Sequence, residues 1–96
     1  MAQFDVCRIR GGGLVIDCQA NLLDSLPTRF VVPLRPADAS VMQRLTPVFT
    51  IDGRDYAMFT PLAGAIDVRD IEAIIESLLP HEYAIKSAFD MQISGY

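Results

Sequence analysis

The sequence predicts a small, mainly β domain that ends in an α-helix. The chain has 96 residues, of which 51% are hydrophobic and 21% are charged, so we expect a single globular domain over residues 1–96. Short β-rich segments are separated by Gly, Pro and Asp-Gly turns, and apolar residues at helical spacing follow Pro80. Four or five strands followed by a helix predict a sheet capped by that helix.

The first predicted element is a hairpin of two strands, residues 4–10 and 14–19. A two-residue turn at Gly12-Gly13 places positions that sum to 25 opposite each other, and therefore predicts Cys7 opposite Cys18. No secretory signal is visible at the N-terminus, so the expected compartment is the reducing cytoplasm. We therefore expect both cysteines to be buried free thiols rather than a disulfide.

A polar loop with an apolar centre is predicted next. Residues 21–28 contain Asn, Asp, Ser and Pro around Leu22-Leu23. The third strand, residues 30–34, is expected to end or to lie at a sheet edge at Pro33, which has no N–H to donate. A short helix is predicted within residues 36–46, where apolar residues recur at helical spacing.

A second hairpin is predicted around Asp52-Gly53, a dipeptide typical of tight turns, between strands 47–51 and 56–60. One more short strand is predicted at residues 65–68. The pattern of residues 69–79 alone predicts a helix. Its helical stripe consists of Ile71, Ile74, Ile75 and Leu78.

The last predicted element is a helix that opens at Pro80 and ends at Gly95. Ser77 is a candidate capping residue upstream of it, and Glu82 lies in its first turn. Its apolar stripe consists of Ala84, Ile85, Ala88, Phe89 and Ile93.

Composition narrows the possible partners. Eight Lys and Arg against twelve Asp and Glu give a net charge of -4, which argues against direct binding of nucleic acid because phosphate binding needs clustered basic residues. No apolar run approaches the roughly 18 to 20 residues that span a bilayer, so no membrane association is expected. The high apolar content of so small a domain, with four Met, five Phe and three Tyr, predicts self-association.

No residue pattern indicates catalysis, a metal or a cofactor. Gly11-Gly12-Gly13 lacks the Lys-Ser/Thr of a phosphate-binding loop. Cys7, Cys18 and the distant His81 do not have the spacing of a metal site, and no nucleophile is suitably placed for His81 to act as its base. The sequence therefore predicts a binding protein that is not an enzyme.

Six short motifs follow one another along the chain. They are Gln3–Val6, Ile16–Asp24, Arg29–Leu34, Leu45–Ile51, Tyr56–Thr60 and Ile85–Phe89. Each motif alone is weak, but all six in this order, in a chain of this length, resemble the CcdB family of toxins. The resemblance covers essentially the whole chain, and its main length difference lies in the first hairpin loop, which is short here.

The resemblance implies a small SH3-like antiparallel barrel or sheet of the CcdB/MazF-like type with a C-terminal α-helix. In that family the segment matching residues 69–79 begins as a strand and loop, so helix and strand both remain open for it. The implied function is that of a toxin from a plasmid-maintenance or chromosomal toxin–antitoxin module. As a symmetric homodimer, such a toxin inhibits the topoisomerase DNA gyrase by entering between its two GyrA subunits and trapping the cleaved-DNA complex. A CcdA-like antitoxin neutralises the toxin, and their complex acts as a repressor of its own operon, so DNA is contacted only through that complex.

The resemblance also implies site residues, although four positions depart from the family. Ala20 replaces a Ser, Asp90 replaces an Asn, Ser94 replaces a Trp that stacks on an Arg of gyrase, and Tyr96 replaces an Ile. We expect the dimer interface to include Met91 and Ile93. The implied gyrase-binding residues are Phe4, Ala20, Leu22, Leu23, Asp90, Ser94, Gly95 and Tyr96.

Two alternative functions remain open. MazF- and Kid-like toxins share this barrel but cut RNA, and an endoribonuclease of that type needs a basic groove, which a net charge of -4 disfavours. An inactive homologue would bind its antitoxin without poisoning gyrase.

Overall fold

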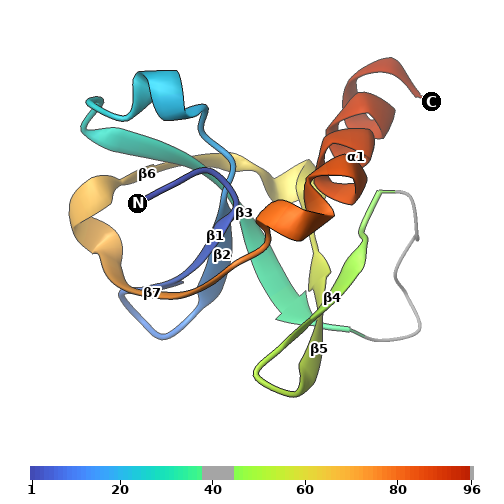
Figure 1. The fold of residues 1–96 in the computed structure, drawn as a ribbon, viewed down its shortest axis with the longest axis horizontal. Coiled ribbons are helices and arrows are strands. Elements are labelled where there is room, and N and C mark those ends of the chain that lie inside the picture. Colours follow the sequence, from blue (N-terminus) through green and yellow to red (C-terminus); the bar gives the residue numbers. More distant parts are fainter. Residues whose placement is uncertain (38–44, 96) are drawn as a thin grey trace.

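The computed structural model describes residues 1–37 and 45–95, and Figure 1 shows their arrangement as one curled sheet with a helix packed beside it. The predicted short helix within residues 36–46 lies largely outside the described residues, as does Tyr96. The strands and helix of the described chain are β1 (Asp5–Ile9), β2 (Leu14–Asp17), β3 (Thr28–Pro36), β4 (Val48–Ile51), β5 (Arg54–Met58), β6 (Gly64–Asp67), β7 (Ile71–Ser77) and α1 (Glu82–Ser94).

All strand pairs in the described chain are antiparallel, in the order β4-β5-β3-β2-β1-β7, with β6 added to β3. The nine-residue strand β3 organises this sheet. Its first half pairs with β6, its second half pairs with β5, and β2 lies along its other side. Because β6 and β5 diverge, the sheet curls into a half-barrel, which confirms the predicted mainly β fold with a C-terminal helix.

Pro33 lies in the middle of β3, so the prediction that the strand ends there or lies at an edge is wrong. Its carbonyl accepts a hydrogen bond from Phe59 N–H at 3.0 Å. The Pro33 nitrogen faces the same side of β3 as this carbonyl. It therefore lies at the gap between the residues of β3 that pair with β6 and those that pair with β5. The strand tolerates proline because no ladder bond is lost there.

The two faces of the sheet carry separate apolar clusters, as strand alternation requires. One face packs against α1 through Ile85 and Ala88 and forms the main core with Val6, Ile16 and Val32. The other face carries a smaller cluster, centred on Cys7, Val15 and Val31.

The first hairpin has a longer loop than the predicted Gly12-Gly13 turn. Cys7 pairs with Val15 rather than Cys18, because residues 10–13 all lie outside the ladder. Gly11 and Gly12 adopt φ of 94° and 93°, a conformation that favours glycine. Cys7 and Cys18 are nevertheless both free and buried, as predicted.

Residues 71–77 form strand β7, so the helix predicted from their pattern is wrong. β7 pairs with β1 through two register shifts, and each shift leaves one extra residue of β7 without a partner. Each extra residue lengthens the spacing between successive apolar residues from two positions towards three or four, which is the spacing typical of a helix. The strand-and-loop alternative is confirmed for this segment.

The remaining elements agree with the predictions. Asp52 and Gly53 form the β4–β5 turn with φ of 54° and 78°, and β6 occupies the predicted short strand. A 3-10 turn, Leu79–His81, precedes α1, and Gly95 ends the helix in the left-handed conformation. Ser77 Oγ accepts a hydrogen bond from Leu79 N–H at 3.2 Å, so it caps this turn rather than α1 itself.

Candidate binding surface

The β2–β3 loop, residues 18–27, displays apolar side chains to solvent. Leu22 is 94% exposed and Leu23 is 47% exposed, and both lie on a 3-10 turn, Asn21–Leu23. The turn closes through hydrogen bonds from Leu23 N–H to the Ala20 carbonyl and from Asp24 N–H to the Asn21 carbonyl. An ordered backbone therefore holds an apolar pair outside the core, as expected of a binding surface.

A buried ion-pair network fixes the base of this loop. Arg29 at the start of β3 is almost fully buried, and its Nη2 and Nε lie 2.6 and 3.1 Å from Asp17 Oδ2. Its Nη1 donates to Asp24 Oδ1 at 3.0 Å, which ties the far side of the loop to the same guanidinium. Burial alone would lower the pKa of Arg29, but the hydrogen bonds to Asp17 and Asp24 raise it. Arg29 therefore stays charged and holds both carboxylates.

Sequence reasoning missed this network, although the strands carry a signal of it. Asp17 stands between Ile16 and Cys18, and Arg29 directly precedes the apolar run of its β-rich segment. Charged residues in such positions are rarely buried unless they pair, so their coexistence indicates a buried pair. The pattern alone does not show which loop the pair would anchor.

Phe4 lies in the core rather than on the surface. Its side chain is 2% exposed, and its backbone adopts a φ of 72°, which is unusual for an aromatic residue. Its N–H donates to the Asp17 carbonyl, and its own carbonyl accepts from Leu78 N–H at 2.8 Å. Phe4 therefore joins the N-terminus to β2 and to the start of the helical segment, and its ring is covered.

The other implied site residues lie at the C-terminal end of α1. Asp90, Ser94 and Gly95 are exposed, Met91 is half-buried, and Ile93 is 80% exposed. Of the predicted apolar stripe, Ile85 and Ala88 are buried, whereas Ile93 extends past the core. The helix therefore ends in an uncovered apolar side chain.

The implied site residues occupy two separate areas rather than one cluster. Figure 1 shows the β2–β3 loop and the end of α1 projecting from different parts of the molecule, both towards the top of the view. Phe30 of β3 connects them, because it borders the loop and its ring lies 5.7 Å from that of Phe89 on α1. A partner that contacts both areas must be extended or must provide two surfaces.

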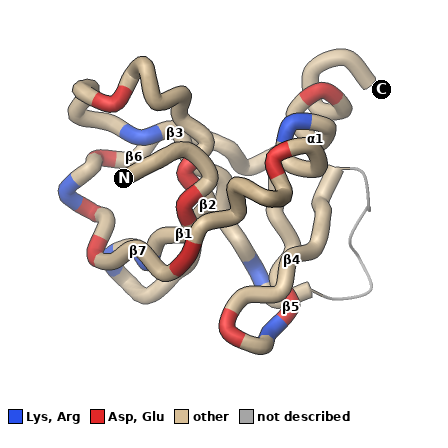
Figure 2. The backbone as a smooth tube through the Cα atoms, in the orientation of Figure 1, with Lys and Arg blue, Asp and Glu red and all other residues tan. Residues whose placement is uncertain are grey.

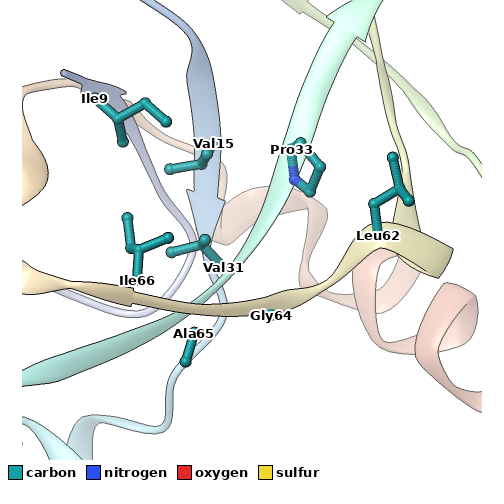
Figure 3. Close-up of a pocket in the computed structure, with 8 residues that line it drawn as sticks. All are labelled: Ile9, Val15, Val31, Pro33, Leu62, Gly64, Ala65 and Ile66. Carbon is teal, nitrogen blue, oxygen red and sulfur yellow. The ribbon is translucent and has the colours of Figure 1, made fainter. Parts of the chain in front are cut away.

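An apolar hollow of about 270 Å³ lies on the sheet face opposite α1. Figure 3 shows the valine and isoleucine side chains of this face directed into it from β1, β2, β3 and β6. The lining residues are Ile9, Val15, Val31, Pro33, Leu62, Gly64, Ala65 and Ile66. No titratable side chain is among these lining residues, so the hollow offers no acid–base chemistry.

Basic side chains do not gather into a groove within the described chain. Figure 2 shows Lys and Arg spread over several elements, interspersed with Asp and Glu. Arg10, Arg69 and Lys86 each lie within 3.8 Å of a carboxylate. Across residues 1–37 and 45–95, no group of three or more His, Cys, Asp or Glu could hold a metal ion. None of the helices in those ranges is long and apolar enough to cross a membrane.

The described chain is thus a curled sheet closed by a helix, with two leucines displayed on a braced loop. The family model described as CcdB protein matches residues 3–95, nearly the whole chain. The chain therefore belongs to the CcdB family, whose members are toxins of toxin–antitoxin modules rather than classical enzymes. The resemblance of the six motifs is thereby confirmed. No curated protein matches the chain in a sequence comparison.

Proposed function

We propose that this toxin binds the GyrA subunits of DNA gyrase and traps the cleaved-DNA complex. The observation that carries the proposal is the exposure of Leu22 on a loop whose base is fixed by the buried Arg29–Asp17 pair. An exposed leucine on an ordered loop loses little conformational freedom on binding, so most of its burial contributes to affinity. Membership of the CcdB family supports gyrase as the partner, and gyrase acts in the cytoplasm.

The proposed gyrase contact has two parts. Ala20, Leu22 and Leu23 form the first part, and the end of α1 with Asp90, Ser94, Gly95 and Tyr96 forms the second. Phe4 contributes by supporting the base of the loop, since its ring is buried. Ser94 cannot stack on a guanidinium, so the tail contributes less to affinity than an aromatic residue would, and the loop carries correspondingly more.

A homodimer is part of the proposal. Ile93 is 80% exposed and Met91 is half-buried near the end of α1, and a two-fold axis beside this helix end would bury both residues of each copy. The dimer would display two β2–β3 loops, one for each GyrA chain of gyrase. Sedimentation at micromolar concentration should show one species of twice the 10.6 kDa chain mass; a species of the chain mass would contradict the dimer.

A CcdA-like antitoxin is the proposed neutralising partner, and its complex with the toxin is the proposed repressor of their operon. The toxin carries a net charge of -4, and like charges across an interface lower the association rate and the affinity. The antitoxin therefore binds mainly through apolar contacts, across the β2–β3 loop and α1, and in doing so blocks gyrase.

Expression in living cells tests the proposed target. We expect induced expression to arrest cells with sensitive gyrase and to spare cells whose gyrase resists CcdB-family toxins. Arrest of both strains to the same extent would refute gyrase as the target and would favour an RNA-cutting toxin. Survival of both strains at a confirmed level of folded protein would identify an inactive homologue.

A further inference from the structure

The β2–β3 ladder changes at its last position, where side chains replace a backbone bond. The register from Leu14↔Leu34 to Asp17↔Val31 places Cys18 opposite Phe30. Cys18 N–H donates to the Phe30 carbonyl at 2.8 Å, as an antiparallel pair requires. The return bond is replaced, because Phe30 N–H donates to the side-chain Oε1 of Gln19 at 2.9 Å.

A second glutamine, Gln3, supplies the donor for the Cys18 carbonyl, which lacks the Phe30 N–H as a partner. The Cys18 carbonyl accepts a hydrogen bond from Gln3 Nε2 at 3.2 Å. The Gln3 backbone N–H donates to Asn21 Oδ1 at 2.9 Å, so the N-terminal segment also holds the start of the 3-10 turn. Two side-chain amides therefore replace the last backbone hydrogen bond between β2 and β3, at the point where the chain leaves the sheet. Every backbone group named here still has a partner.

The Gln19 side-chain amide forms hydrogen bonds through both its oxygen and its nitrogen, and the nitrogen reaches across the loop. Its Nε2 donates to the Leu23 carbonyl at 2.7 Å, and its backbone N–H donates to Asp17 Oδ1 at 3.0 Å. The Gln19 side chain is buried, the bond to Asp17 is buried with it, and the bond to the Leu23 carbonyl is partly buried. The Gln19 side chain thus ties the turn that carries the exposed leucines to strand β3, and its backbone N–H ties the same residue to the buried ion pair.

Few side chains can replace this amide. The site needs an acceptor for Phe30 N–H and a donor for the Leu23 carbonyl, at the reach of a Gln side chain. An ionised Glu offers no donor, Met offers no donor and only a weak acceptor, and Asn is one methylene shorter. Loss of the amide leaves the partly buried Phe30 N–H without its partner and releases the turn.

We propose that Gln19 is a positioning residue that holds Leu22 and Leu23 in the orientation that gyrase contacts. The proposal rests on the proposed function for the identity of the partner, but the bracing itself belongs to the free toxin. A braced turn binds more tightly because its ordering is completed during folding rather than during association.

The test compares Gln19→Met with the control Thr50→Val in the full-length toxin. Thr50 is exposed in β4, and its hydroxyl donates to Asp55 Oδ1 at 2.7 Å. The control therefore also removes a side-chain hydrogen bond, but at the β4–β5 hairpin, away from the loop (Figure 1). Amide hydrogen exchange is followed by NMR, and binding to purified GyrA is titrated for each variant.

A positioning role predicts faster exchange of the Leu23 and Asp24 amides in Gln19→Met, while the core amides of Val6 and Val32 exchange as in the natural protein. It also predicts that affinity for GyrA falls about tenfold, the scale of one or two lost hydrogen bonds. Thr50→Val should match the natural protein in both measurements.

Faster exchange throughout the chain of Gln19→Met would assign the residue a general role in stability and would overturn the proposal. Unchanged exchange at Leu23 and Asp24 would overturn it as well. Failure of the natural protein to bind GyrA would refute the proposed function, whereas the exchange of the loop amides would still decide whether Gln19 braces the turn.

Discussion

Replacement of Leu22 by alanine separates binding from folding more cleanly than other changes in the β2–β3 loop. Leu22 is 94% exposed, so the substitution removes almost no packing and should change the free energy of unfolding by less than about 0.5 kcal/mol. Full burial of a leucine side chain in a complex contributes about 1.5 to 3 kcal/mol, of which alanine keeps a minor part. We therefore expect the affinity for GyrA to fall by about ten- to a hundredfold.

Isothermal titration of each variant against purified GyrA measures this effect, and thermal denaturation confirms the fold. Leu79→Ala provides the matched control, because Leu79 is 54% exposed, lies at the other end of α1 from Ile93 and has no place in the proposed contact. We expect its affinity to equal that of the natural protein. Unchanged affinity of Leu22→Ala, or an equal loss in both variants, would refute the proposed role of the loop.

Four further predictions concern the folded chain. Arg29→Met leaves the buried Asp17 carboxylate unpaired and should lower the free energy of unfolding by about 3 to 5 kcal/mol in urea titrations; a loss below about 1 kcal/mol would contradict the network. Gly53→Ala should cost about 1 to 2 kcal/mol in the same assay, because the backbone φ of 78° disfavours a Cβ although nothing lies within 4 Å. Burial raises the pKa of Cys7 to about 11 and that of Cys18 to about 12 from 9.0, so the unfolded thiols ionise first, and stability should fall as pH rises above 9. Native thiols should also resist a thiol reagent at pH 8, and rapid labelling without denaturant would contradict their burial.

The fold was predictable where local chemistry determines it. Asp52-Gly53 specified its turn, and Gly95 marked the end of α1. Strand β7 was not predictable from its pattern, because the two shifts in its pairing with β1 give isoleucines a helical spacing. The predicted register of the first hairpin is wrong for a related reason. Three successive glycines permit several loop lengths, and only the packing of β1 against β2 and β7 selects one of them.

At the candidate site, the exposure of the loop leucines was predictable from the sequence, but the contacts that hold the loop in place were not. Leu22-Leu23 stood out as an apolar pair in a polar loop, and the structure exposes both. The support beneath them depends on contacts across the sheet, from Arg29 to Asp17 and from Gln19 to Phe30, which no local pattern encodes. Phe4 illustrates the opposite case, because its place in a family motif did not reveal that its ring is buried.

Incubation of the purified toxin with gyrase and supercoiled plasmid tests the central claim most directly. The natural protein should convert plasmid into a linear product once the trapped complex is treated with detergent and protease, and Leu22→Ala should need about ten- to a hundredfold more protein for the same yield. Labelled RNA in a parallel reaction should remain intact. Absence of linear plasmid at saturating toxin, or cleavage of the RNA, would contradict the assignment of this chain as a gyrase poison.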